Sequence, residues 1–441
     1  MPTANALSLF SGAGGDTLGL ENAHYSVRCF SEMFLPAIAT HLKAFPHSLL
    51  LKNSEGKTNI CHIPDELFLP MRGSINIIFA GFPCQGFSHA GKKKENDPRN
   101  ELVHQFVRAT KLIQPDWIIG ENVKGLLSRK GVHPTSKKKM PIIQIIQSLF
   151  AEIGYKITWK LIVATDFGVP QERQRVIIIG KRGNSFPHFN FVPTPAAPPT
   201  CIRPLLEPTL YGAVEFTPTP EELESPLWIE TTETSPCGIP HPNLVRLLNG
   251  IRNKSAKEII LELSINYPGK SPEEIWSIQN PGMTLPSKNK IKLASLIPEK
   301  NVHSAQGLIS FRRRSSSYHG QICNPDEPSK TIICTYGLCP RLFVGLRNKV
   351  TKTYYVRPFT LTELAQIQGF PKDYPFVGTE KHIITQIGNA VPPAIVSSVV
   401  NRLNSIVFKD TPQFNAAIVL KEELNDGEED DMEEEEEGVL I

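Results

Sequence analysis

Short apolar runs alternate with amphipathic segments through the first 185 residues, and this alternation constrains the fold of the 441-residue chain more than any other feature. Runs typical of buried strands end near residues 9, 80 and 123, and another covers 157–164. Residues 102–113 and 142–153 carry apolar side chains at helical spacing. Strands that alternate with helices predict an α/β fold, a doubly wound and mostly parallel sheet with helices on both faces.

The pattern changes after residue 185, where proline becomes frequent and the alternation stops. We therefore expect residues 1–185 to form one domain and residues 186–355 to form a second, smaller and irregular domain. Residues 356–410 return to helix-like patterns and should complete the first domain. Residues 411–441 should form an acidic, disordered tail.

The charge of the chain is strongly asymmetric. Residues 421–441 hold twelve acidic residues and one basic residue, which leaves 46 basic and 32 acidic residues in the first 420, a net charge of +14. A basic body suits a polyanionic partner such as nucleic acid. Shielding of the basic surface, binding of a partner and a purely solubilising role all remain open for the tail.

The eight cysteines are scattered, and no two of them form a Cys-x-x-Cys pair. This spacing indicates neither a zinc site nor a disulfide framework, so we expect no metal. We see no charged and apolar leader and no apolar run of membrane length. We therefore expect an intracellular protein with reduced thiols and no membrane association.

A cysteine and a glutamate stand just past two of the apolar runs. Cys84 lies in Gly-Phe-Pro-Cys-Gln-Gly-Phe-Ser after the run at 75–80, and Glu121 follows the run that begins at residue 117. Neighbouring parallel strands would bring both to one sheet edge, where open α/β sheets bind ligands. Since a carboxylate raises the pKa of a nearby thiol, Glu121 should act on the substrate rather than on Cys84. For Cys84 alone, a buried core residue is the commoner alternative.

The segment 171–175 reads Gln-Glu-Arg-Gln-Arg and precedes an apolar run at 176–179. In a strand, Gln171, Arg173 and Arg175 would share one face. Two guanidinium groups on one face could offset a thiolate and bind a carbonyl oxygen. A solvated strand edge is the alternative interpretation of this charged run.

A glycine-rich turn at 11–15 lies between an expected strand and an expected helix near the N-terminus. Backbone amides in such a turn can surround a carboxylate or a phosphate. Glu32 follows the next apolar stretch, where an acidic residue often binds ribose hydroxyls. Together they predict a pocket for a nucleoside with an acidic group, although an ordinary strand-to-helix connection would also use glycines.

Six segments together resemble the motifs of the S-adenosylmethionine-dependent DNA (cytosine-5)-methyltransferases, in the order of that family. They include the cofactor turn, the Pro-Cys-Gln and Glu-Asn-Val segments and the Gln-x-Arg-x-Arg segment. The resemblance covers residues 7 to 393, and its specificity comes from the joint match. The matching segments are 10–15, 83–85, 121–123, 171–175, 357–371 and 388–393.

The resemblance implies a pocket for S-adenosylmethionine, in which Phe10 lies against the adenine and Glu32 holds the ribose. Two positions depart from the family, which usually has acidic residues where Ser8 and Asn59 stand. The amide oxygen of Asn59 could still accept a hydrogen bond from the adenine amino group. The residues implied to bind the cofactor are Phe10, Ser11, Gly12, Ala13, Gly14, Gly15, Glu32, Asn59, Pro83, Leu102, Asn389 and Val391.

The catalytic residues implied by the resemblance are Cys84, Glu121, Arg173 and Arg175. The Cys84 thiolate would add to carbon 6 of cytosine while Glu121 binds or protonates N3, which makes carbon 5 nucleophilic enough to accept a methyl group. Arg175 would hold the cytosine O2, and Arg173 would lie near the nucleophile. The base would have to leave the duplex to be reached.

By the same resemblance, residues 86–100 form a mobile loop that closes over the flipped base, and residues 186–355 form a target-recognition domain. Basic side chains beside glycine fit phosphate contacts, although an ordinary solvated loop is the alternative. The arginine run at 312–314 should contact the DNA backbone more than the bases. The expected DNA-binding residues are Gln85, Ser88, Lys92, Lys93, Arg99, Arg312, Arg313 and Arg314.

The expected partner is double-stranded DNA, with a monomeric enzyme and a restriction endonuclease that acts on the same site without direct contact. Three alternatives stay open: an RNA (tRNA) cytosine-5 methyltransferase, a catalytically silent DNA-binding homologue, and a cofactor-binding structural protein. The size of the insert favours an enzyme that reads duplex DNA, and the presence of Cys84 and Glu121 argues against a silent homologue. The expected location is the cytoplasm, or the nucleus if the source is eukaryotic or a virus of eukaryotes.

Overall fold

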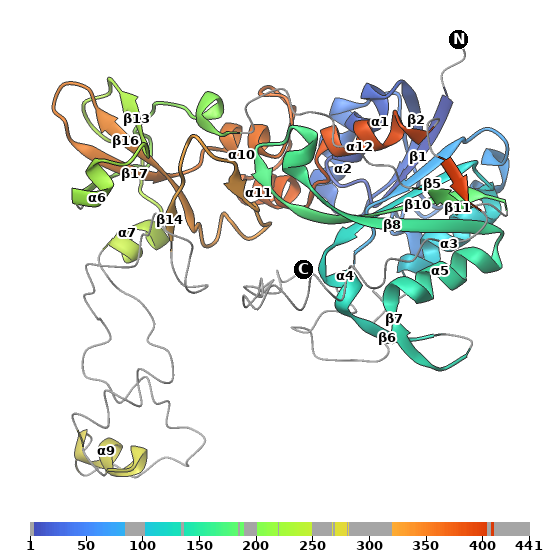
Figure 1. Ribbon diagram of the computed structural model, residues 1–441, viewed down its shortest axis with the longest axis horizontal. Coiled ribbons are helices and arrows are strands. Elements are labelled where there is room, and N and C mark those ends of the chain that lie inside the picture. The colour runs from blue at the N-terminus through green and yellow to red at the C-terminus, as the bar shows by residue number, and fades with distance from the viewer. Residues whose placement is uncertain are drawn as a thin grey trace. The chain divides into compact units, whose positions relative to one another are not determined.

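The computed structural model describes residues 4–83, 102–133, 136–183, 186–188, 201–218, 220–248, 267, 270–279, 281, 320–403 and 407–409. The chain divides into two compact units (Figure 1). The first unit comprises residues 1–207, 324–339 and 359–441, and the second comprises residues 208–323 and 340–358.

Seven strands form the central sheet of the first unit, in the order β3-β2-β1-β4-β5-β10-β8. The neighbours from β3 to β5 pair in parallel, whereas β10 runs antiparallel to both β5 and β8. The prediction of a mostly parallel α/β sheet is therefore confirmed. These strands are β1 (Ala4–Leu9), β2 (Tyr25–Ser31), β3 (Leu49–Leu50), β4 (Ile77–Ala80), β5 (Trp117–Val123), β8 (Tyr155–Val163) and β10 (Gln174–Arg182).

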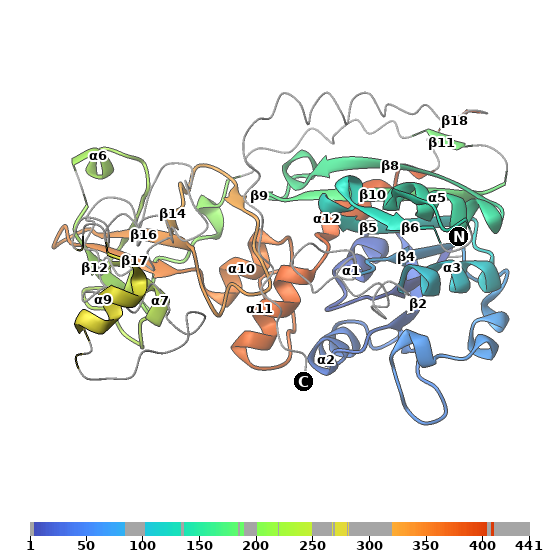
Figure 2. The same cartoon turned by 90° about the horizontal axis from the view of Figure 1, so that it is seen from below.

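Helices cover both faces of this sheet, as Figures 1 and 2 show. Successive residues of β4 point to opposite faces: Ile78 packs in one core with Phe106 of α3, and Ile77 packs in the other with Leu20 of α1 and Val396 of α12. The helices of this unit are α1 (Gly15–Asn22), α2 (Leu35–Ala44), α3 (Leu102–Ile113), α4 (Gly125–Ser128), α5 (Ile142–Glu152), α10 (Leu361–Ile367), α11 (Glu380–Asn389) and α12 (Pro393–Val400).

The first and last helices of the unit pack closely because α1 carries a glycine at the contact. A Cβ on Gly19 would lie 2.5 Å from both the carbonyl oxygen of Pro393 and Cβ of Val396. Any larger residue at position 19 would separate α1 from α12. This contact ties the C-terminal segment to the N-terminal turn that precedes α1.

Short elements complete the first unit. The strand pairs are β6 with β7, β9 with β15, and β11 with β18. Their bounds are β6 (Lys130–Val132), β7 (Lys139–Pro141), β9 (Gln171–Glu172), β11 (Phe186–His188), β15 (Ser329–Lys330) and β18 (Val407–Lys409). The one-turn 3-10 helices are η1 (Ile60–His62), η2 (Asp65–Leu67), η3 (Leu69–Met71), η6 (Ala164–Phe167) and η7 (Arg203–Leu205).

The second unit contains a small sheet in the order β12-β17-β16-β13, with β14 added to β16. Its core holds Leu244, Phe343 and Val356. The strands of this sheet are short and lie between prolines. For this reason the sequence pattern indicated an irregular domain. The elements are β12 (Val214–Phe216), β13 (Trp228–Thr231), β14 (Gln321–Ile322), β16 (Leu342–Asn348), β17 (Tyr354–Pro358), α6 (Pro220–Leu223), α7 (Pro242–Leu248) and α9 (Pro272–Gln279).

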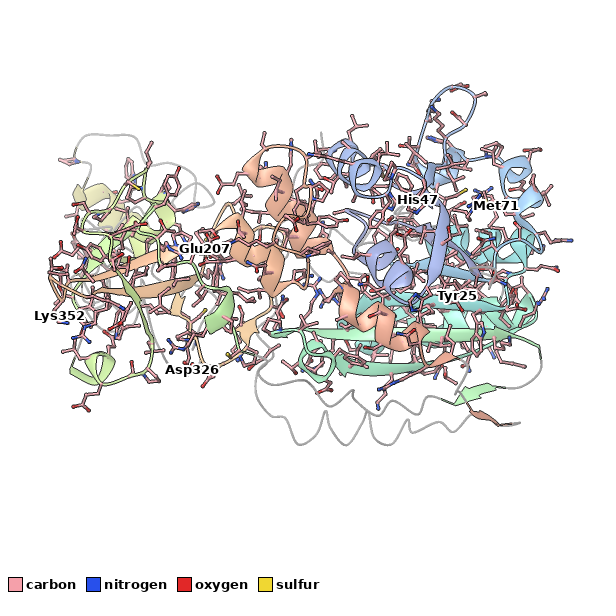
Figure 3. All side chains as sticks on the ribbon, turned by 90° about the horizontal axis from the view of Figure 1, so that it is seen from above. Tyr25, His47, Met71, Glu207, Asp326 and Lys352 are labelled. Atoms are coloured by element: carbon pink, nitrogen blue, oxygen red, sulfur yellow. The ribbon has the colours of Figure 1, made fainter. Side chains whose placement is uncertain are left out.

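The boundary between the units differs from the expected 186–355 segment, because two pieces of that segment belong to the first unit. Residues 324–339 return to it through β15, which pairs in parallel with β9. Arg203 donates to the carboxylate of Asp326 at 2.5 and 2.7 Å, which holds residues 203–207 beside this return segment (Figure 3 labels Glu207 and Asp326). The expected tail at 411–441 lies outside the described residues.

One segment of the described chain, Glu380–Val400, is long and apolar enough to cross a membrane by length and composition alone. However, 67% of its apolar window is buried inside the protein. The segment comprises α11 and α12, and Ile395, Val396 and Val399 are core residues. Packing in the core of the first unit therefore accounts for its hydropathy.

Candidate active site

The carboxyl ends of β1, β4 and β5 meet at one edge of the sheet. The parallel register pairs Leu9 with Ala80 and Ala80 with Gly120. A Cβ built on Gly81 would lie 3.6 Å from Val391 Cγ2, 3.8 Å from Glu121 Oε2 and 3.9 Å from the carbonyl oxygen of Phe10. Residues expected to serve the cofactor and the base thus meet around Gly81.

A side chain of β5 anchors the backbone that leads to Cys84. Asn122 Nδ2 donates to the carbonyl oxygen of Phe82 at 2.9 Å, and its Oδ1 accepts from the Val123 amide at 2.9 Å. Phe82 is buried and Pro83 is exposed. Cys84 itself lies outside the described residues. This role of Asn122 could not be predicted from the sequence, because only the fold brings its side chain to Phe82.

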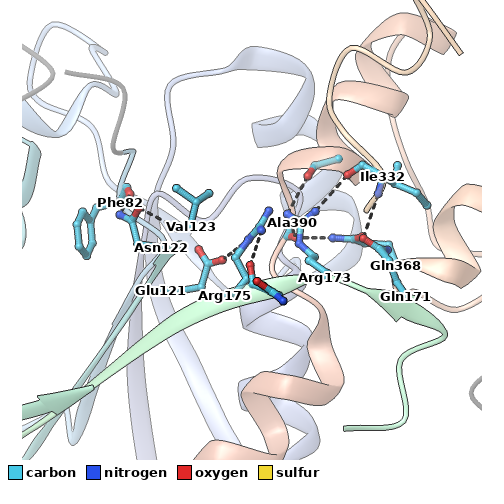
Figure 4. A network of polar contacts seen from close by, with 12 residues as sticks. Phe82, Glu121, Asn122, Val123, Gln171, Arg173, Arg175, Ile332, Gln368 and Ala390 are labelled. Atoms are coloured by element: carbon cyan, nitrogen blue, oxygen red, sulfur yellow. Dashed lines mark hydrogen bonds and ion pairs between the residues drawn. The ribbon is translucent and has the colours of Figure 1, made fainter. Parts of the chain in front are cut away.

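Glu121 is a buried carboxyl that forms an ion pair with Arg175. Arg175 Nε lies 3.0 Å from Glu121 Oε1, and their side chains are only 12% and 11% exposed (Figure 4). Burial raises the pKa of Glu121, and the charges of Arg175 and Arg173 oppose this shift. Arg175 Nη1 also donates to the carbonyl oxygen of Gln174 at 2.7 Å, which fixes the guanidinium plane. This ion pair brings the Glu-Asn-Val and Gln-x-Arg-x-Arg segments together at the end of β5.

Arg173 is held by backbone carbonyl groups from segments far along the chain. It is almost completely buried, and its guanidinium donates to the carbonyl oxygens of Ile332, Gly388 and Ala390 at 3.1, 2.9 and 3.2 Å. These carbonyls belong to the return segment and to the loop after α11. Arg173 therefore joins three distant stretches of the chain, in addition to lowering the pKa of Glu121 through its charge.

Two glutamines extend this network (Figure 4). Gln171 Oε1 accepts from the Ile332 amide at 3.1 Å, and its Nε2 donates to Gln368 Oε1 at 2.7 Å. Gln368 Nε2 donates in turn to the carbonyl oxygen of Ala390 at 2.5 Å. Both glutamines are fully buried, a state that is rare without hydrogen-bond partners. Gln368 belongs to the matching segment 357–371, but its structural role depends on partners that the sequence does not reveal.

The glycine-rich turn adopts an unusual backbone conformation. Phe10, Gly12 and Gly14 have φ angles of +58°, +54° and +86°, so three alternate residues are left-handed. The Phe10 amide donates to Ser31 Oγ at 3.2 Å and the Ser11 amide to the Ser31 carbonyl oxygen at 3.0 Å. These bonds from the end of β2 hold a conformation that costs energy for a phenylalanine.

Glu32 holds the turn from the other side. Its Oε2 accepts from the Gly12 amide at 2.8 Å, and its Oε1 accepts from the Met33 and Phe34 amides at 2.7 and 2.8 Å. The side chain expected to bind a ribose therefore also connects the turn with the start of α2. A Cβ on Gly12 would meet no atom within 4 Å, so the turn faces open space at this residue. The geometry fits a nucleoside cofactor that approaches Gly12 beside Glu32 and Phe10.

A buried carboxyl lies beneath the turn. Asp16 accepts a short hydrogen bond from Ser8 Oγ and another from Ser11 Oγ at 3.2 Å. Ser11 Oγ lies 3.4 Å from Thr17 Oγ1, which lies 3.0 Å from Nε2 of His41. Burial raises the pKa of Asp16 to about 6 and lowers the pKa of His41 to about 3. Ser8 stands where the family usually has an acidic residue, and its hydrogen-bond partner is the acidic side chain of Asp16, eight residues later.

The remaining expected cofactor residues have separate positions. Asn389 is exposed at the end of α11, and Val391 packs beside Gly81. Asn59 caps η1, where its Oδ1 accepts from the Cys61 amide at 3.0 Å. Leu102 begins α3 and packs against the core on that face of the sheet. The expected DNA-binding residues Gln85, Ser88, Lys92, Lys93, Arg99, Arg312, Arg313 and Arg314 lie outside the described residues.

Within the described residues, no group of three or more His, Cys, Asp or Glu side chains could hold a metal ion. None of the seven cysteines in the same part of the chain forms a disulfide, and Cys61 and Cys237 are exposed.

Residues 4–405 match the sequence profile of the C-5 cytosine-specific DNA methylases. The chain belongs to this family. It is therefore a DNA (cytosine-5)-methyltransferase, with S-adenosylmethionine as the methyl donor and DNA as the substrate. The family description and the Type II relatives favour DNA over the tRNA alternative.

Two relatives are similar over most of their length. The chain is 28% identical to the Type II methyltransferase M.DdeI of Desulfomicrobium norvegicum, with 91% of this chain and 88% of the relative covered. It is also 28% identical to M1.HphI of Haemophilus parahaemolyticus, over 89% and 84%. A solved methyltransferase of Entamoeba histolytica has the same fold, with a TM-score of 0.53 at 15% identity, over 92% of this chain and 99% of that one.

Proposed function

We propose that this methyltransferase acts on a flipped-out cytosine held at the sheet edge around Gly81. The observation that supports this best is the approach of Phe10, Glu121 and Val391 to that glycine. A target base has to lie between the nucleophile and the methyl donor, and Gly81 precedes Cys84 by only three residues in the sequence. Extraction of the base from the duplex costs roughly a few kcal/mol.

In the proposed reaction, the Cys84 thiolate adds to carbon 6 while Glu121 protonates N3 and Arg175 holds O2. The electron pair displaced by this addition makes carbon 5 nucleophilic. S-adenosylmethionine supplies the electrophilic methyl group. A base then removes the proton from carbon 5, and the returning electron pair expels the Cys84 thiolate and restores the ring. The buried environment of Glu121 supports its role, since burial favours the protonated carboxyl.

The cofactor would bind at the turn, with Phe10 against the adenine and Glu32 and Asn389 around the ribose. The amides of 11–15 would face the methionine carboxylate. Glu32 already accepts hydrogen bonds from three backbone amides, but each of its carboxylate oxygens can accept a further hydrogen bond from a ribose hydroxyl. The open side of Gly12 supports the same position.

We further assign target recognition to the second unit and sequence-specific modification of cellular DNA in the cytoplasm to the whole enzyme. The Type II relatives support a modification enzyme that shares its site with a restriction endonuclease. The enzyme would work as a monomer and without a metal ion.

Trapping of the covalent adduct tests this proposal. Bisulfite sequencing of a plasmid from the expression host first defines the methylated site. A duplex with 5-fluorocytosine at that site is then mixed with enzyme and S-adenosylmethionine, and the adduct is measured by denaturing electrophoresis. Fluorine cannot leave as a cation, so the thiol cannot be eliminated and the adduct should persist.

Cys84→Ser should abolish the adduct, whereas the matched change Cys61→Ser at an exposed cysteine should leave it intact. Methylation that survives Cys84→Ser would contradict the proposed nucleophile. An adduct that forms equally without 5-fluorocytosine would contradict the proposed chemistry.

A further inference from the structure

A small β-hairpin follows the strand that carries Glu121. The chain leaves β5 at Val123, passes through α4 and enters β6, which pairs antiparallel with β7 (Figure 1). Lys130 pairs with Pro141 and Val132 with Lys139. The Ile142 amide donates to the carbonyl oxygen of Arg129 at 3.0 Å and closes the base of the hairpin. The sequence alone indicates no role for this segment.

The hairpin carries a concentrated positive charge. Residues 122–151 contain six lysines and arginines and no aspartate or glutamate. Lys130, Lys137, Lys138 and Lys139 are all exposed, and none of them forms an ion pair with any residue that the structure describes. Adjacent like charges repel one another, so the fold gains nothing from this arrangement. The charge points instead to an anionic partner.

The hairpin holds these lysines in a defined geometry. His133 is buried, and its Nε2 lies 2.6 Å from Ser148 Oγ on α5. The His133 amide donates to the carbonyl oxygen of Lys138 at 2.9 Å, and the Lys137 amide donates back to His133 at 2.9 Å. Lys137 has a φ of +55°, a conformation that few residues other than glycine adopt. Such a turn, fixed to a helix, presents its lysines without a large loss of freedom on binding.

We propose that this lysine hairpin, residues 129–133 and 136–141, binds the phosphate backbone of the substrate DNA. The proposal rests on the proposed function only in that DNA reaches the edge where β5 ends. Arg129, at the base of the hairpin, lies six residues after Val123, so the hairpin is joined through α4 to the strand that carries Glu121. Val132, 57% exposed between the lysines, adds an apolar contact for a deoxyribose. Contacts of this kind fix position and orientation without reading sequence.

The dependence of DNA affinity on salt tests the proposal. Each phosphate neutralised by a lysine contributes about 0.9 to the slope of log affinity against log salt concentration. The variant Lys130→Gln/Lys138→Gln/Lys139→Gln removes three charges and leaves the left-handed Lys137 unchanged. Fluorescence anisotropy should show a slope smaller by about 2 to 3, with an affinity loss of roughly tenfold or more at low salt.

Two further variants make the result specific. Lys43→Gln/Lys52→Gln/Lys372→Gln changes the net charge equally at exposed lysines elsewhere in the first unit, and it should leave the slope almost unchanged. Replacement of the three hairpin lysines by arginine should preserve the slope, since the charge is kept. Thermal unfolding of each variant shows whether the fold is intact.

The ratio of affinities for duplexes with and without the target site should stay the same in the hairpin variant, as should binding of S-adenosylmethionine and kcat at saturating DNA. An unchanged slope, or an equal loss in the control variant, would overturn the hairpin proposal. The adduct assay is independent of these measurements, so a wild-type enzyme that forms the adduct while the slope stays unchanged would refute the hairpin alone.

Discussion

Two buried carboxyl groups in the first unit, Asp16 and Glu121, differ in what offsets their burial. Asp16 is held by the hydroxyl groups of Ser8 and Ser11, whereas Glu121 faces the guanidinium of Arg175 at 3.0 Å. Burial raises the pKa of both groups. Hydroxyl groups stabilise a carboxyl without adding charge, while a guanidinium stabilises its ionised form directly.

The difference indicates separate tasks. Asp16 is enclosed beneath the glycine-rich turn, where it accepts hydrogen bonds from Ser8 and Ser11. Its role is therefore to support the turn, without contact to the substrate. Glu121 stands at an open strand end with a cation that can also bind a carbonyl oxygen. Burial therefore identifies a functional carboxyl only together with its position at the sheet edge and the nature of its partner.

Glu121→Gln should have the largest effect. Glutamine keeps the shape and can still accept a hydrogen bond from Arg175, but it cannot transfer a proton to N3. We expect kcat to fall by about 10² to 10⁴, with binding of S-adenosylmethionine unchanged. Single-turnover methylation and calorimetry measure the two quantities. Activity within tenfold of the wild type would remove Glu121 from the chemistry.

Arg175→Gln should have the next largest effect. Loss of the adjacent cation leaves the burial of Glu121 less opposed, so the pKa of Glu121 should rise further. The limb of the pH–rate profile that reports Glu121 should move to higher pH, and kcat should fall by about 10- to 100-fold because O2 loses its partner. Arg175→Lys keeps the charge, so the pKa of Glu121 should rise less than in Arg175→Gln. An unchanged pH profile in Arg175→Gln would contradict the coupling between the two residues.

Much of this site follows from the sequence, and the remainder has an identifiable physical cause. Strand ends and turns are local, so the positions of Glu121 and of the glycine-rich turn could be predicted from apolar runs and glycine spacing. The carbonyl partners of Arg173 lie about 160 to 215 residues further along the chain. No local pattern indicates such partners, and the return of residues 324–339 to the first unit is equally non-local.

The partnership of Ser8 and Asp16 has a similar cause. The sequence shows that Ser8 replaces an acidic residue, but Asp16 belongs to the next helix and reaches Ser8 only because the turn folds back. The short strands of the second unit were missed for a different reason. They pair across long separations, such as β12 with β17, and carry too few residues for a clear alternation.

Asp16→Asn should affect stability and its dependence on pH. The pKa of Asp16 is about 6 in the folded protein against an ordinary value of 3.8, so the fold favours the neutral form. The stability that Asp16 contributes is present below pH 3.8 and is lost as the pH rises through 6. Asparagine does not titrate, so its stability relative to wild type should grow by up to about 3 kcal/mol between pH 4 and 6.

Urea denaturation at several pH values measures this difference. His41 acts in the opposite sense, because its lowered pKa of about 3 makes the fold lose stability as the pH falls below 6.5. The difference between variant and wild type cancels the His41 contribution, which both proteins share. A stability difference that stays constant from pH 4 to 7 would contradict the raised pKa of the buried Asp16 carboxyl.

Asn122→Ala should have the smallest effect. It removes the hydrogen bond to the Phe82 carbonyl oxygen and should lower the free energy of unfolding by about 1 to 2 kcal/mol. Phe82, the residue that Asn122 holds, lies two residues before Cys84. The rate of adduct formation should therefore fall more than the affinity for S-adenosylmethionine. Equal losses in both would show that Asn122 acts on the fold as a whole and has no separate effect on the edge near Glu121.

The most direct test of the account is a crystal structure of the enzyme trapped on a 5-fluorocytosine duplex. We predict a bond from Cys84 Sγ to carbon 6, with a carboxyl oxygen of Glu121 about 2.6 to 3.2 Å from N3 and the Arg175 guanidinium beside O2. A trapped base whose N3 lies away from Glu121, or a bond from another cysteine, would contradict the central claim that these three side chains converge on one cytosine.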